Sequence, residues 1–494
     1  MARRSTLADL GLTPRTGAGA GGANPALTGI TVDSRAVKPG FLFAALPGST
    51  VHGAAFARSA VDKGAVAILT DAAGARLLEA EAAVPLVVVE DAREALARAA
   101  ALWFGMQPAR MVAVTGTNGK TSVATFTRQI WEALDHAAIN IGTTGVEGAW
   151  TAPSSHTTPD ALTLHAMLAA AAAAGVTHGA MEASSHGLDQ RRMDGVRLCA
   201  AGFTNLTQDH LDYHGTMDAY LEAKAALFTR LLPDDGIAVV NLNGAHGSDI
   251  VERCLDRGLP TMTIGHGQGA DLRILSQRYD ATGQDLRFSW QGQPYMTRLN
   301  LVGGFQAENV ALAAGLAIAS GDDPQAVFAT LPKLSGVRGR MQLAATRTNG
   351  AAVYVDYAHT PDAIETALKA LRPHVMGRIV IVFGAGGDRD TTKRPLMGAA
   401  AAAHADVLFV TDDNPRSENP ASIRAAILAA CPDATEVGDR AEAILRGVDA
   451  LQPGDALLIA GKGHETGQTI AGQVYPFDDV EQASVAVAAL DGVI

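Results

Sequence analysis

MVAVTGTNGKT, at residues 111–121, joins an apolar run to a glycine-bearing turn and then to a Lys-Thr pair. The apolar residues predict a buried strand, and the spacing of Val123, Phe126 and Ile130 predicts a helix directly after the turn. A helix N-terminus offers unpaired N–H groups to an anion, and glycines let the backbone approach phosphate closely. In such a loop Lys120 reaches the β- and γ-phosphates of a nucleotide, and Thr121 can bind magnesium. The stretch therefore predicts a site for ATP or GTP.

This turn departs at one position from the common phosphate-loop pattern G-x-x-x-x-G-K-[ST]. Val114 stands where that pattern has its first glycine, and Gly116 follows it. The stretch is thus a shortened variant. The alternative interpretation is an Asn-Gly turn between strand and helix, with a solvated lysine.

The length of 494 residues predicts about three domains at the usual size of about 100–200 residues each. No apolar run approaches the roughly 20 residues of a membrane helix, and no apolar segment follows the N-terminal arginines as in a secretion signal. The net charge of −12 disfavours non-specific nucleic-acid binding. The three cysteines lie far apart and form no C-x-x-C motif. We therefore expect a cytoplasmic protein that binds neither membranes nor nucleic acid.

Residues 1–108 alternate apolar runs with helical patterns, which predicts a small α/β domain. Polar loops follow two of the apolar runs, at residues 33–35 and 47–53. They are suited to a polar ligand, although ordinary turns explain the same residues equally well.

Residues 109–340 repeat a strand–helix–strand pattern, which predicts a parallel sheet with β-hairpins inserted at residues 271–302. Thr158 before Pro159 predicts the start of a helix, with Thr158 as its cap. Glu182 ends an apolar strand, where a carboxylate needs a partner, so we expect a cation near it. Residues 207–215 are rich in oxygen and nitrogen ligands but lack cysteine, which favours a hard ion held with phosphate over zinc.

Lys224 is out of place on the apolar face of a helix predicted to begin near Thr216. Three interpretations are open. The side chain extends to solvent, or it lies near an anion, or it is modified so that it is no longer cationic.

Residues 341–494 begin a further series of strands, each followed by a polar loop, at residues 356–362, 384–390, 412–416 and 461–465. Such loops meet at one edge of a doubly wound sheet, where these sheets bind ligands. The run GAGGDRD at 384–390 partly imitates the dinucleotide pattern G-x-G-x-x-G, but Arg389 replaces the third glycine. A nicotinamide site is therefore a weakly supported alternative.

In their order along the chain, six motifs resemble those of the Mur ligase family, and most closely its members that use meso-diaminopimelate. The motifs are TGTNGKT (115–121), EASSHGL (182–188), DHLDYH (209–214), DYAHTP (356–361), DNPR (413–416) and GKGHE (461–465). The resemblance covers nearly the whole chain. It implies an α/β protein with a UDP-substrate-binding domain (1–108), a central P-loop ATPase-like domain with β insertions (109–340) and a Rossmann-like C-terminal domain that binds the amino acid (341–494).

The implied activity is that of a monomeric, ATP- and Mg²⁺-dependent ligase of peptidoglycan precursor synthesis. Such a ligase joins meso-diaminopimelate to the D-glutamate of UDP-N-acetylmuramoyl-L-alanyl-D-glutamate through an acyl phosphate, and so serves cell wall growth, shape and division. A lysine-adding muramyl ligase or a folylpolyglutamate synthase shares the central domain, but the DNPR run disfavours both. A non-catalytic, ATP-gated binding protein is an alternative from another class.

The family's functional residues are carried over only where this sequence matches its motifs. For ATP the resemblance implies Gly116, Thr117, Asn118, Gly119, Lys120, Thr121, Ser122, Asn309, Arg340 and Asp356. The implied catalytic residues are Lys120, Glu182, His210 and Lys224, and the implied magnesium site is Thr121, Glu182, His210 and Lys224, with Lys224 carbamylated. The UDP-muramoyl-dipeptide is assigned Val32, Ser34, Ser49, Thr50, Val51, Thr157, Thr158, Ser184, Gln190 and Arg192. Diaminopimelate is assigned Arg389, Asp413, Asn414, Pro415, Arg416, Gly461 and Glu465.

Overall fold

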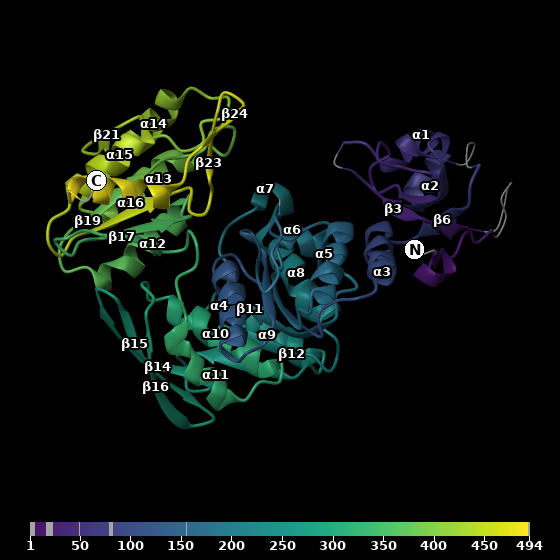
Figure 1. Cartoon of the computed structure of the whole chain (residues 1–494), viewed down its shortest axis with the longest axis horizontal. Coiled ribbons are helices and arrows are strands. Elements are labelled where there is room, and N and C mark those ends of the chain that lie inside the picture. Colours follow the sequence, from purple (N-terminus) through teal and green to yellow (C-terminus); the bar gives the residue numbers. More distant parts are fainter. Residues whose placement is uncertain (1–4, 16–22, 49, 79–82, 155, 493–494) are drawn as a thin grey trace. The chain divides into compact units, whose positions relative to one another are not determined.

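A computed structural model of the chain describes residues 5–15, 23–48, 50–78, 83–154 and 156–492 (Figure 1). The chain divides into two compact units, Met1–Ile264 with Leu312–Pro324, and Gly265–Ala311 with Gln325–Ile494. Parallel sheets flanked by helices occur in both units, which confirms the predicted α/β class. The domain boundaries at residues 108 and 340 stay predictions.

The N-terminal sheet is parallel, with its strands in chain order β3-β4-β5-β6. Apolar clusters on its two faces pack under the helices. The predicted alternation of strands and helices is confirmed, and helix α2 was not predicted. The elements are β1 (Ser5–Thr6), η1 (Ala8–Leu10), β2 (Ala26–Leu27), β3 (Gly29–Thr31), β4 (Phe41–Ala44), η2 (Gly53–Phe56), α1 (Ala57–Asp62), β5 (Ala65–Asp71), α2 (Ala72–Leu78), β6 (Leu86–Val89) and α3 (Ala92–Phe104).

Strands β7 to β13 of the central sheet lie in the order β13-β12-β11-β7-β10-β8-β9, and among these seven only β9 is antiparallel to its neighbour. Strand β7 lies between β10 and β11, and residues 111–114 are at most 1% exposed. Both faces of this strand are therefore buried, which explains its continuous apolar run. The elements are β7 (Arg110–Thr115), α4 (Lys120–Ala133), β8 (Ala138–Gly142), β9 (Gly145–Gly148), α5 (Ala161–Ala173), β10 (His178–Glu182), α6 (Ser185–Asp189), β11 (Leu198–Phe203), α7 (Leu211–His214), α8 (Met217–Ala226), the π-helical turn η3 (Leu227–Leu231), β12 (Ile237–Asn241), α9 (Gly247–Asp256) and β13 (Thr261–Gly265).

The start of helix α5 corrects one sequence prediction. Asp160, not Thr158, caps this helix, since its carboxylate accepts from the backbone N–H groups of Leu162 and Thr163, each at 3.1 Å. The Thr158 hydroxyl instead donates to the backbone carbonyl of Glu182 at 2.8 Å. A long-range partner thus outcompetes the local cap.

The inserted hairpins predicted for residues 271–302 are present as the antiparallel strands β14, β15 and β16. The C-terminal sheet has the order β17-β18-β22-β19-β20-β21, with only β17 antiparallel. The elements are β14 (Leu272–Asp280), β15 (Gly283–Trp290), β16 (Gln293–Leu299), α10 (Gln306–Ala319), α11 (Pro324–Thr330), η4 (Leu331–Lys333), β17 (Gln342–Thr346), β18 (Ala352–Asp356), α12 (Pro361–Leu371), η5 (Arg372–His374), β19 (Ile379–Phe383), α13 (Lys393–His404), β20 (Val407–Val410), α14 (Pro420–Leu428), β21 (Thr435–Glu436), α15 (Arg440–Asp449), β22 (Ala456–Ala460), β23 (Gly467–Ile470), β24 (Gln473–Pro476) and α16 (Asp479–Leu490).

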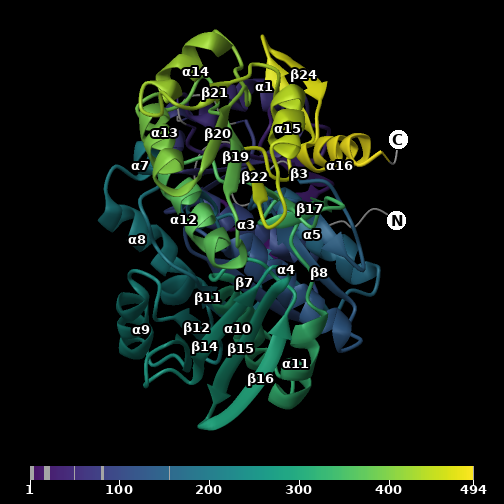
Figure 2. The same cartoon turned by 90° about the vertical axis from the view of Figure 1, so that its left-hand side faces the viewer.

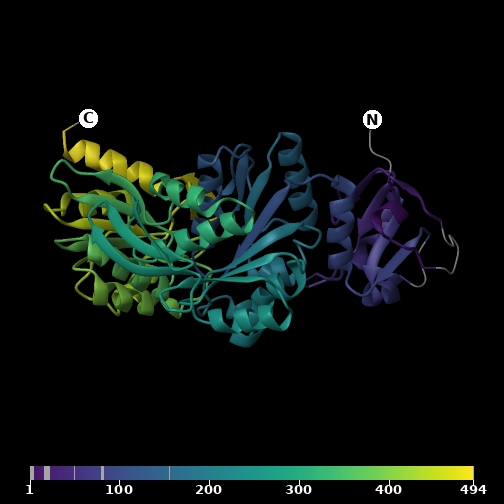
Figure 3. The ribbon, with the colours of Figure 1, turned by 90° about the horizontal axis from the view of Figure 1, so that it is seen from below.

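Helices cover the two faces of the C-terminal sheet in two groups. Helices α12, α13 and α14 pack on one apolar cluster, and α15 and α16 pack on the other (Figure 2). In Figure 3, α16 is the yellow helix next to the C-terminus. Within the described ranges, no helix is both long enough and apolar enough to cross a membrane.

Candidate active site

The predicted phosphate loop lies between β7 and α4, as the sequence indicates. Gly116 has φ +145°, and a Cβ there would lie 1.8 Å from Thr204 Oγ1, so no larger residue fits. Gly119, at φ +89°, is the N-cap of α4. Val114 is only 1% exposed inside β7, where a glycine would weaken the strand. The shortened loop therefore begins after a complete strand.

A second loop, directly after β11, holds the phosphate loop in shape. The Thr117 N–H donates to the Asn205 carbonyl at 2.8 Å, and Thr204 Oγ1 donates to the Asn118 carbonyl at 2.6 Å. The Asn118 N–H donates to Asn205 Oδ1 at 3.0 Å. Sequence reasoning missed Thr204 and Asn205, because nothing in the sequence shows that β11 pairs with β7.

Lys120 and Lys224 both donate to the backbone carbonyl of Gly116, at 2.9 and 2.7 Å. Lys120 also donates to the Thr117 carbonyl at 2.8 Å. Lys224 is 1% exposed, which confirms its predicted place on the apolar face of α8 and excludes the solvent-seeking interpretation. Burial, and then the charge of Lys120, lowers the pKa of Lys224 well below its ordinary value. A neutral amine is therefore accessible at this position.

Glu182 ends β10 and is 1% exposed. Its carboxylate accepts from the Thr143 N–H at 2.8 Å and from the hydroxyls of Thr121 and Thr143 at 3.0 and 3.4 Å. A Cβ on Gly142 would lie 2.0 Å from Glu182 Oε1, so glycine makes room for the carboxylate. These donors come from neutral groups, and the cation expected near Glu182 stays a prediction. Thr143 was missed by sequence reasoning.

Magnesium is suited to Thr121 and Glu182, because it takes hard oxygen ligands from one or two carboxylates together with substrate phosphates. Among the contacts of the described residues, none joins His210 to Thr121 or Glu182. It lies at the N-cap of α7 with φ +52°, its side chain is 46% exposed, and its ring lies 5.0 Å from that of His186. In the described part of the chain, no group of three or more His, Cys, Asp or Glu side chains could hold a metal ion.

Five residues predicted to contact the muramoyl dipeptide gather beside Glu182. Thr157 shares a hydrogen bond of 3.0 Å with Thr143, and Thr158 accepts from the Ser184 N–H at 2.9 Å. Arg192 donates to the Thr158 carbonyl at 2.7 Å and to Gln190 Oε1 at 2.8 Å. These contacts place the predicted dipeptide residues next to the phosphate loop through Glu182.

The remaining predicted substrate residues follow β3 and β4 in the N-terminal sheet. Val32 and Val51 are 45% and 52% exposed, and Ser34 accepts from Lys63 Nζ at 3.0 Å through its carbonyl. Thr50 lies in the same loop as Val51, whereas Ser49 lies outside the described residues. These loops follow the carboxyl ends of parallel strands, as the sequence predicts.

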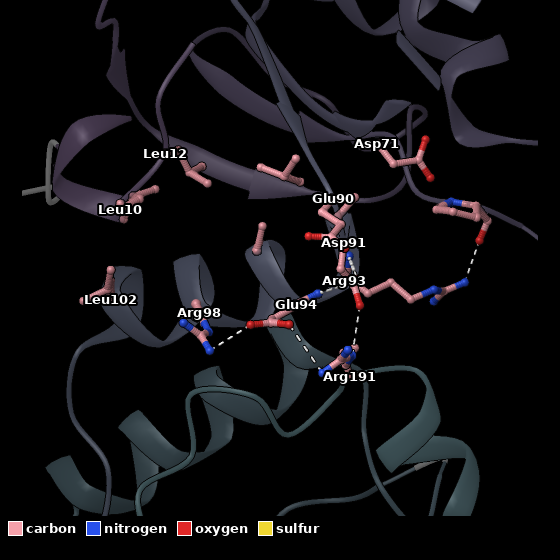
Figure 4. A pocket seen from close by; sticks show the side chains of 15 residues that line it. Leu10, Leu12, Asp71, Glu90, Asp91, Arg93, Glu94, Arg98, Leu102 and Arg191 are labelled. Carbon is pink, nitrogen blue, oxygen red and sulfur yellow. Dashed lines mark hydrogen bonds and ion pairs between the residues drawn. The ribbon is translucent and has the colours of Figure 1, made fainter. Parts of the chain in front are cut away.

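A hollow of about 1000 Å³ lies along the edge of β5 and β6 and the start of α3 (Figure 4). It is crossed by ion pairs from Arg191 to Asp91 at 2.9 Å and to Glu94 at 3.4 Å, and from Arg98 to Glu94 at 2.8 Å. No residue predicted to bind substrate lines it. Arg98 and Arg191 are thus paired with carboxylates, whereas Arg93 donates to the Pro47 carbonyl.

Three residues predicted to face the nucleotide lie in the second unit. Asn309 donates to Gln306 Oε1 at 3.1 Å, and the Arg340 guanidinium lies 4.5 Å from the centre of the Tyr357 ring. Asp356 accepts from the N–H groups of Met341 and Ala358, at 2.6 and 2.9 Å. Burial raises the pKa of Asp356, and the Arg340 charge opposes that rise.

The predicted amino-acid residues lie in loops after β19, β20 and β22. Asn414 Nδ2 donates to Glu465 Oε2 at 2.9 Å, and a Cβ on Gly461 would lie 2.4 Å from Asp413 Oδ2. Arg416, at φ +53°, follows Pro415 and donates through Nη1 to the Gly387 carbonyl at 2.6 Å. The structure therefore joins the loops of the DNPR and GKGHE motifs, while Arg389 is exposed.

His464, within the GKGHE loop, is held neutral. Its Nδ1 is buried and has no hydrogen-bond partner among the described residues. Burial, aided by the charge of Arg340, lowers the pKa of His464 to about 4. An unfolded histidine takes up a proton near pH 6.5. Below about pH 6.5 the unfolded chain therefore takes up a proton that the folded His464 does not. The free energy of unfolding is highest above about pH 6.5 and decreases as the pH falls towards 4.

We expect His464→Gln to reduce the acid sensitivity of folding, because glutamine does not titrate. Between pH 7 and 5 the wild type should lose roughly 1–2 kcal/mol more unfolding free energy than the variant. Urea unfolding at the two pH values measures this difference. Equal losses in the two proteins would contradict a neutral buried His464.

Comparisons with known proteins agree with this arrangement. Profiles described as Mur ligase family catalytic domain, Mur ligase middle domain, and Mur ligase glutamate ligase domain match residues 26–104, 114–317 and 339–463. Proteins of Caulobacter vibrioides and Bradyrhizobium diazoefficiens are 52% and 51% identical to this chain, over 95% and 94% of it and 97% and 95% of their own lengths. Both are named UDP-N-acetylmuramoyl-L-alanyl-D-glutamate–2,6-diaminopimelate ligase. A solved structure with that name is 36% identical, with a TM-score of 0.69 over 94% of this chain and 95% of the other.

Proposed function

The chain belongs to the Mur ligase family, and from this premise we propose that it joins meso-diaminopimelate to UDP-N-acetylmuramoyl-L-alanyl-D-glutamate. ATP supplies the energy for the new amide bond. The reaction is a step in building the peptidoglycan precursor. Action in the cytoplasm and a monomeric state stay predictions.

The position of Glu182 carries this proposal. Its carboxylate accepts from Thr121 of the phosphate loop, and its backbone carbonyl accepts from Thr158 of the dipeptide group. One residue therefore links the predicted sites of the γ-phosphate and the acceptor carboxylate. A ligase that phosphorylates a carboxylate needs these two groups side by side.

In the first step, a carboxylate oxygen of the substrate D-glutamate attacks the γ-phosphorus of ATP, and ADP leaves. Lys120, at the N-terminus of α4, neutralises the transferring phosphoryl group. Thr121 and Glu182 would hold a magnesium ion, which would supply further charge neutralisation when bound. The product of this step is an acyl phosphate.

In the second step, an amine of diaminopimelate attacks the activated carbonyl, and inorganic phosphate leaves as the amide forms. We assign Arg416 to the distal carboxylate of the amino acid, because a planar guanidinium can hold a carboxylate with two parallel hydrogen bonds. Glu465 supplies a carboxylate oxygen for the adjacent ammonium group of the amino acid. Asn414 supplies an amide for the carboxylate group of the amino acid. Lysine lacks the distal carboxylate and would leave Arg416 unpaired.

Phosphate release with UDP-N-acetylmuramoyl-L-alanyl-D-glutamate, ATP and a panel of amino acids tests the reaction and its selectivity. The wild type should respond to meso-diaminopimelate far more than to lysine or glutamate. Arg416→Ala should reduce the preference for meso-diaminopimelate over lysine by about ten- to a hundredfold, since a charge-assisted hydrogen bond is worth about 1.5–3 kcal/mol. Lysine-dependent or folate-dependent release would favour the related ligases, and no release with any amino acid would favour a binding protein. An unchanged preference in Arg416→Ala would move the assignment to Arg389.

A further inference from the structure

Lys462 is a wholly buried cation that none of the preceding assignments uses. Its side chain is 0% exposed, in the loop directly after β22. Its Nζ donates to Glu465 Oε2 at 3.0 Å, to Asn414 Oδ1 at 3.3 Å and to the Gly467 carbonyl at 2.5 Å. An ammonium group has three N–H donors, so these acceptors use all of them. Lys462 therefore has no donor left for a substrate.

The contacts of Lys462 fix the orientation of two neighbouring side chains. Asn414 Oδ1 accepts from Lys462 and from the Thr469 N–H at 2.9 Å, so its amide nitrogen must point the other way, towards Glu465. Glu465 Oε2 accepts from both Lys462 and Asn414. The carboxylate is thereby held through Oε2, and Oε1 accepts none of the hydrogen bonds of the described residues, so it can accept one from a ligand.

The same contacts fasten the hairpin β23–β24 to the DNPR loop. Besides Lys462 to Gly467, Gln468 Nε2 donates to the Asp413 carbonyl at 2.7 Å. The backbone of Arg416 exchanges hydrogen bonds with Thr469 and Ala471, at 3.0 and 2.7 Å. Arg416 therefore takes its left-handed backbone conformation inside a network in which the buried Lys462 ammonium donates directly to the Glu465 carboxylate.

The base of the Lys462 loop is held independently. Arg440 and Asp479 form an ion pair at 2.7 Å with both side chains 0% exposed, and Arg440 donates to the Ala460 carbonyl at 3.0 Å. Arg440 also donates to the Asp412 carbonyl at 3.4 Å, and among the hydrogen bonds of the described residues it has none to Asn414 or Glu465. Loss of the Lys462 ammonium should thus disturb the tip of the loop and spare its base.

We propose that Lys462 is a positioning residue for the amino-acid substrate, which orients Glu465 and Asn414 for a substrate ammonium group without contacting it. The proposal rests on the proposed function and adds a residue to that site. It explains why a lysine is fully buried among polar loops, where an unpaired charge would be costly. The class of ligand is an amino acid whose ammonium group meets the Glu465 carboxylate.

Steady-state kinetics of Lys462→Met test this role, because methionine keeps most of the length of the side chain and removes its charge. The KM for meso-diaminopimelate should rise by about ten- to a hundredfold, as expected for lost charge-assisted hydrogen bonds. The KM values for ATP and for the UDP-linked substrate should stay near those of the wild type. If Lys462→Met does not fold, as judged by circular dichroism, Lys462→Gln decides by the same KM values.

Arg424→Met is the matched control. Arg424 is also a mostly buried cation beside the DNPR loop, with its side chain 14% exposed, and it pairs with Asp412 and Glu436. It has no hydrogen bond to Asn414, Glu465 or Arg416 among those the structure describes. Its removal should leave the KM for meso-diaminopimelate near the wild-type value, which separates the position of Lys462 from the general loss of a buried cation.

A double-mutant cycle shows whether Lys462 acts through Glu465. Lys462→Met combined with Glu465→Gln should raise the KM no further than Glu465→Gln alone, since coupled residues are not additive. Multiplied effects, an unchanged KM in Lys462→Met, or an equal rise in the KM for ATP would each overturn the positioning role. Absence of diaminopimelate-dependent phosphate release by the wild type would overturn the proposed function, and the role of Lys462 with it.

Discussion

Lys120→Ala is expected to lower the rate of ATP-dependent ligation by about a thousandfold, the scale of loss for a preorganised charge at a transferring phosphoryl group. The ammonium is held over the loop by the carbonyls of Gly116 and Thr117. Its charge is most valuable where negative charge develops, so kcat should fall more than the affinity for ATP. Phosphate release at saturating substrate, together with nucleotide binding, measures the two effects separately.

Lys369→Ala is a suitable control for this variant, because Lys369 is an exposed lysine whose ion pair among the described residues is with Glu365 on the surface of α12. Its replacement should leave turnover unchanged. Circular dichroism should show that Lys120→Ala keeps its fold, since α4 packs through its apolar face rather than through Lys120. Turnover near the wild-type rate in Lys120→Ala would refute the phosphate-loop assignment.

Local signals in the sequence predicted most elements around the site. The strand before Gly116 and the helix after Gly119 follow from apolar spacing and from a turn that only glycine fits. The burial of Lys224 follows from its place among apolar neighbours one helical turn away. Both features depend on residues close in the chain, so they are visible without a structure.

Contacts between distant segments were not predictable in the same way. Thr204 and Asn205 hold the phosphate loop only because β11 pairs with β7. The spacing of residues along the chain does not predict the order of strands in a sheet. Thr143 reaches Glu182 because β8 pairs with β10. The burial of Glu182 was predicted through the cost of its charge, but the nature of its partners was not.

Competition between local and distant partners explains the error at α5. Threonine is a residue type that often caps helices, yet the hydroxyl of Thr158 bridges the Glu182 carbonyl and the Ser184 N–H. Asp160 then caps the helix. The gathering of His210 with Glu182 and Lys224, implied by family resemblance, stays a prediction, because the structure shows His210 in an exposed loop.

Lys224→Ala is expected to lose ligation by about a hundred- to a thousandfold, and short carboxylic acids should restore part of it. The reason lies in the chemistry of the buried amine. Burial lowers the pKa of Lys224, so the neutral amine can add to the carbon of carbon dioxide and lose a proton to give a carbamate. We propose that this anion is the active form. In the structure the Nζ atoms of both Lys120 and Lys224 donate to the Gly116 carbonyl, and the carbamate would instead form an opposite-charge pair with Lys120.

Formate, acetate and propionate provide the carboxylate in the space that Lys224→Ala opens. Phosphate release should therefore rise with acid concentration in this variant and stay flat in the wild type. Lys224→Met is the matched control, since methionine fills the same space and leaves no room for the acid. Neither variant can form a carbamate, so both should be inactive without added acid.

The comparison of the two variants separates a lost charge from a lost volume. Rescue of Lys224→Ala alone means that the site needs an anion at the end of this side chain. Rescue of neither variant, with folding intact, would mean that the ammonium itself is required and that Gly116 is its working partner. Full activity of Lys224→Met without acid would remove Lys224 from the reaction altogether. Its burial on α8 would then reflect only its hydrogen bond to Gly116 and its packing 4.5 Å over the Tyr220 ring.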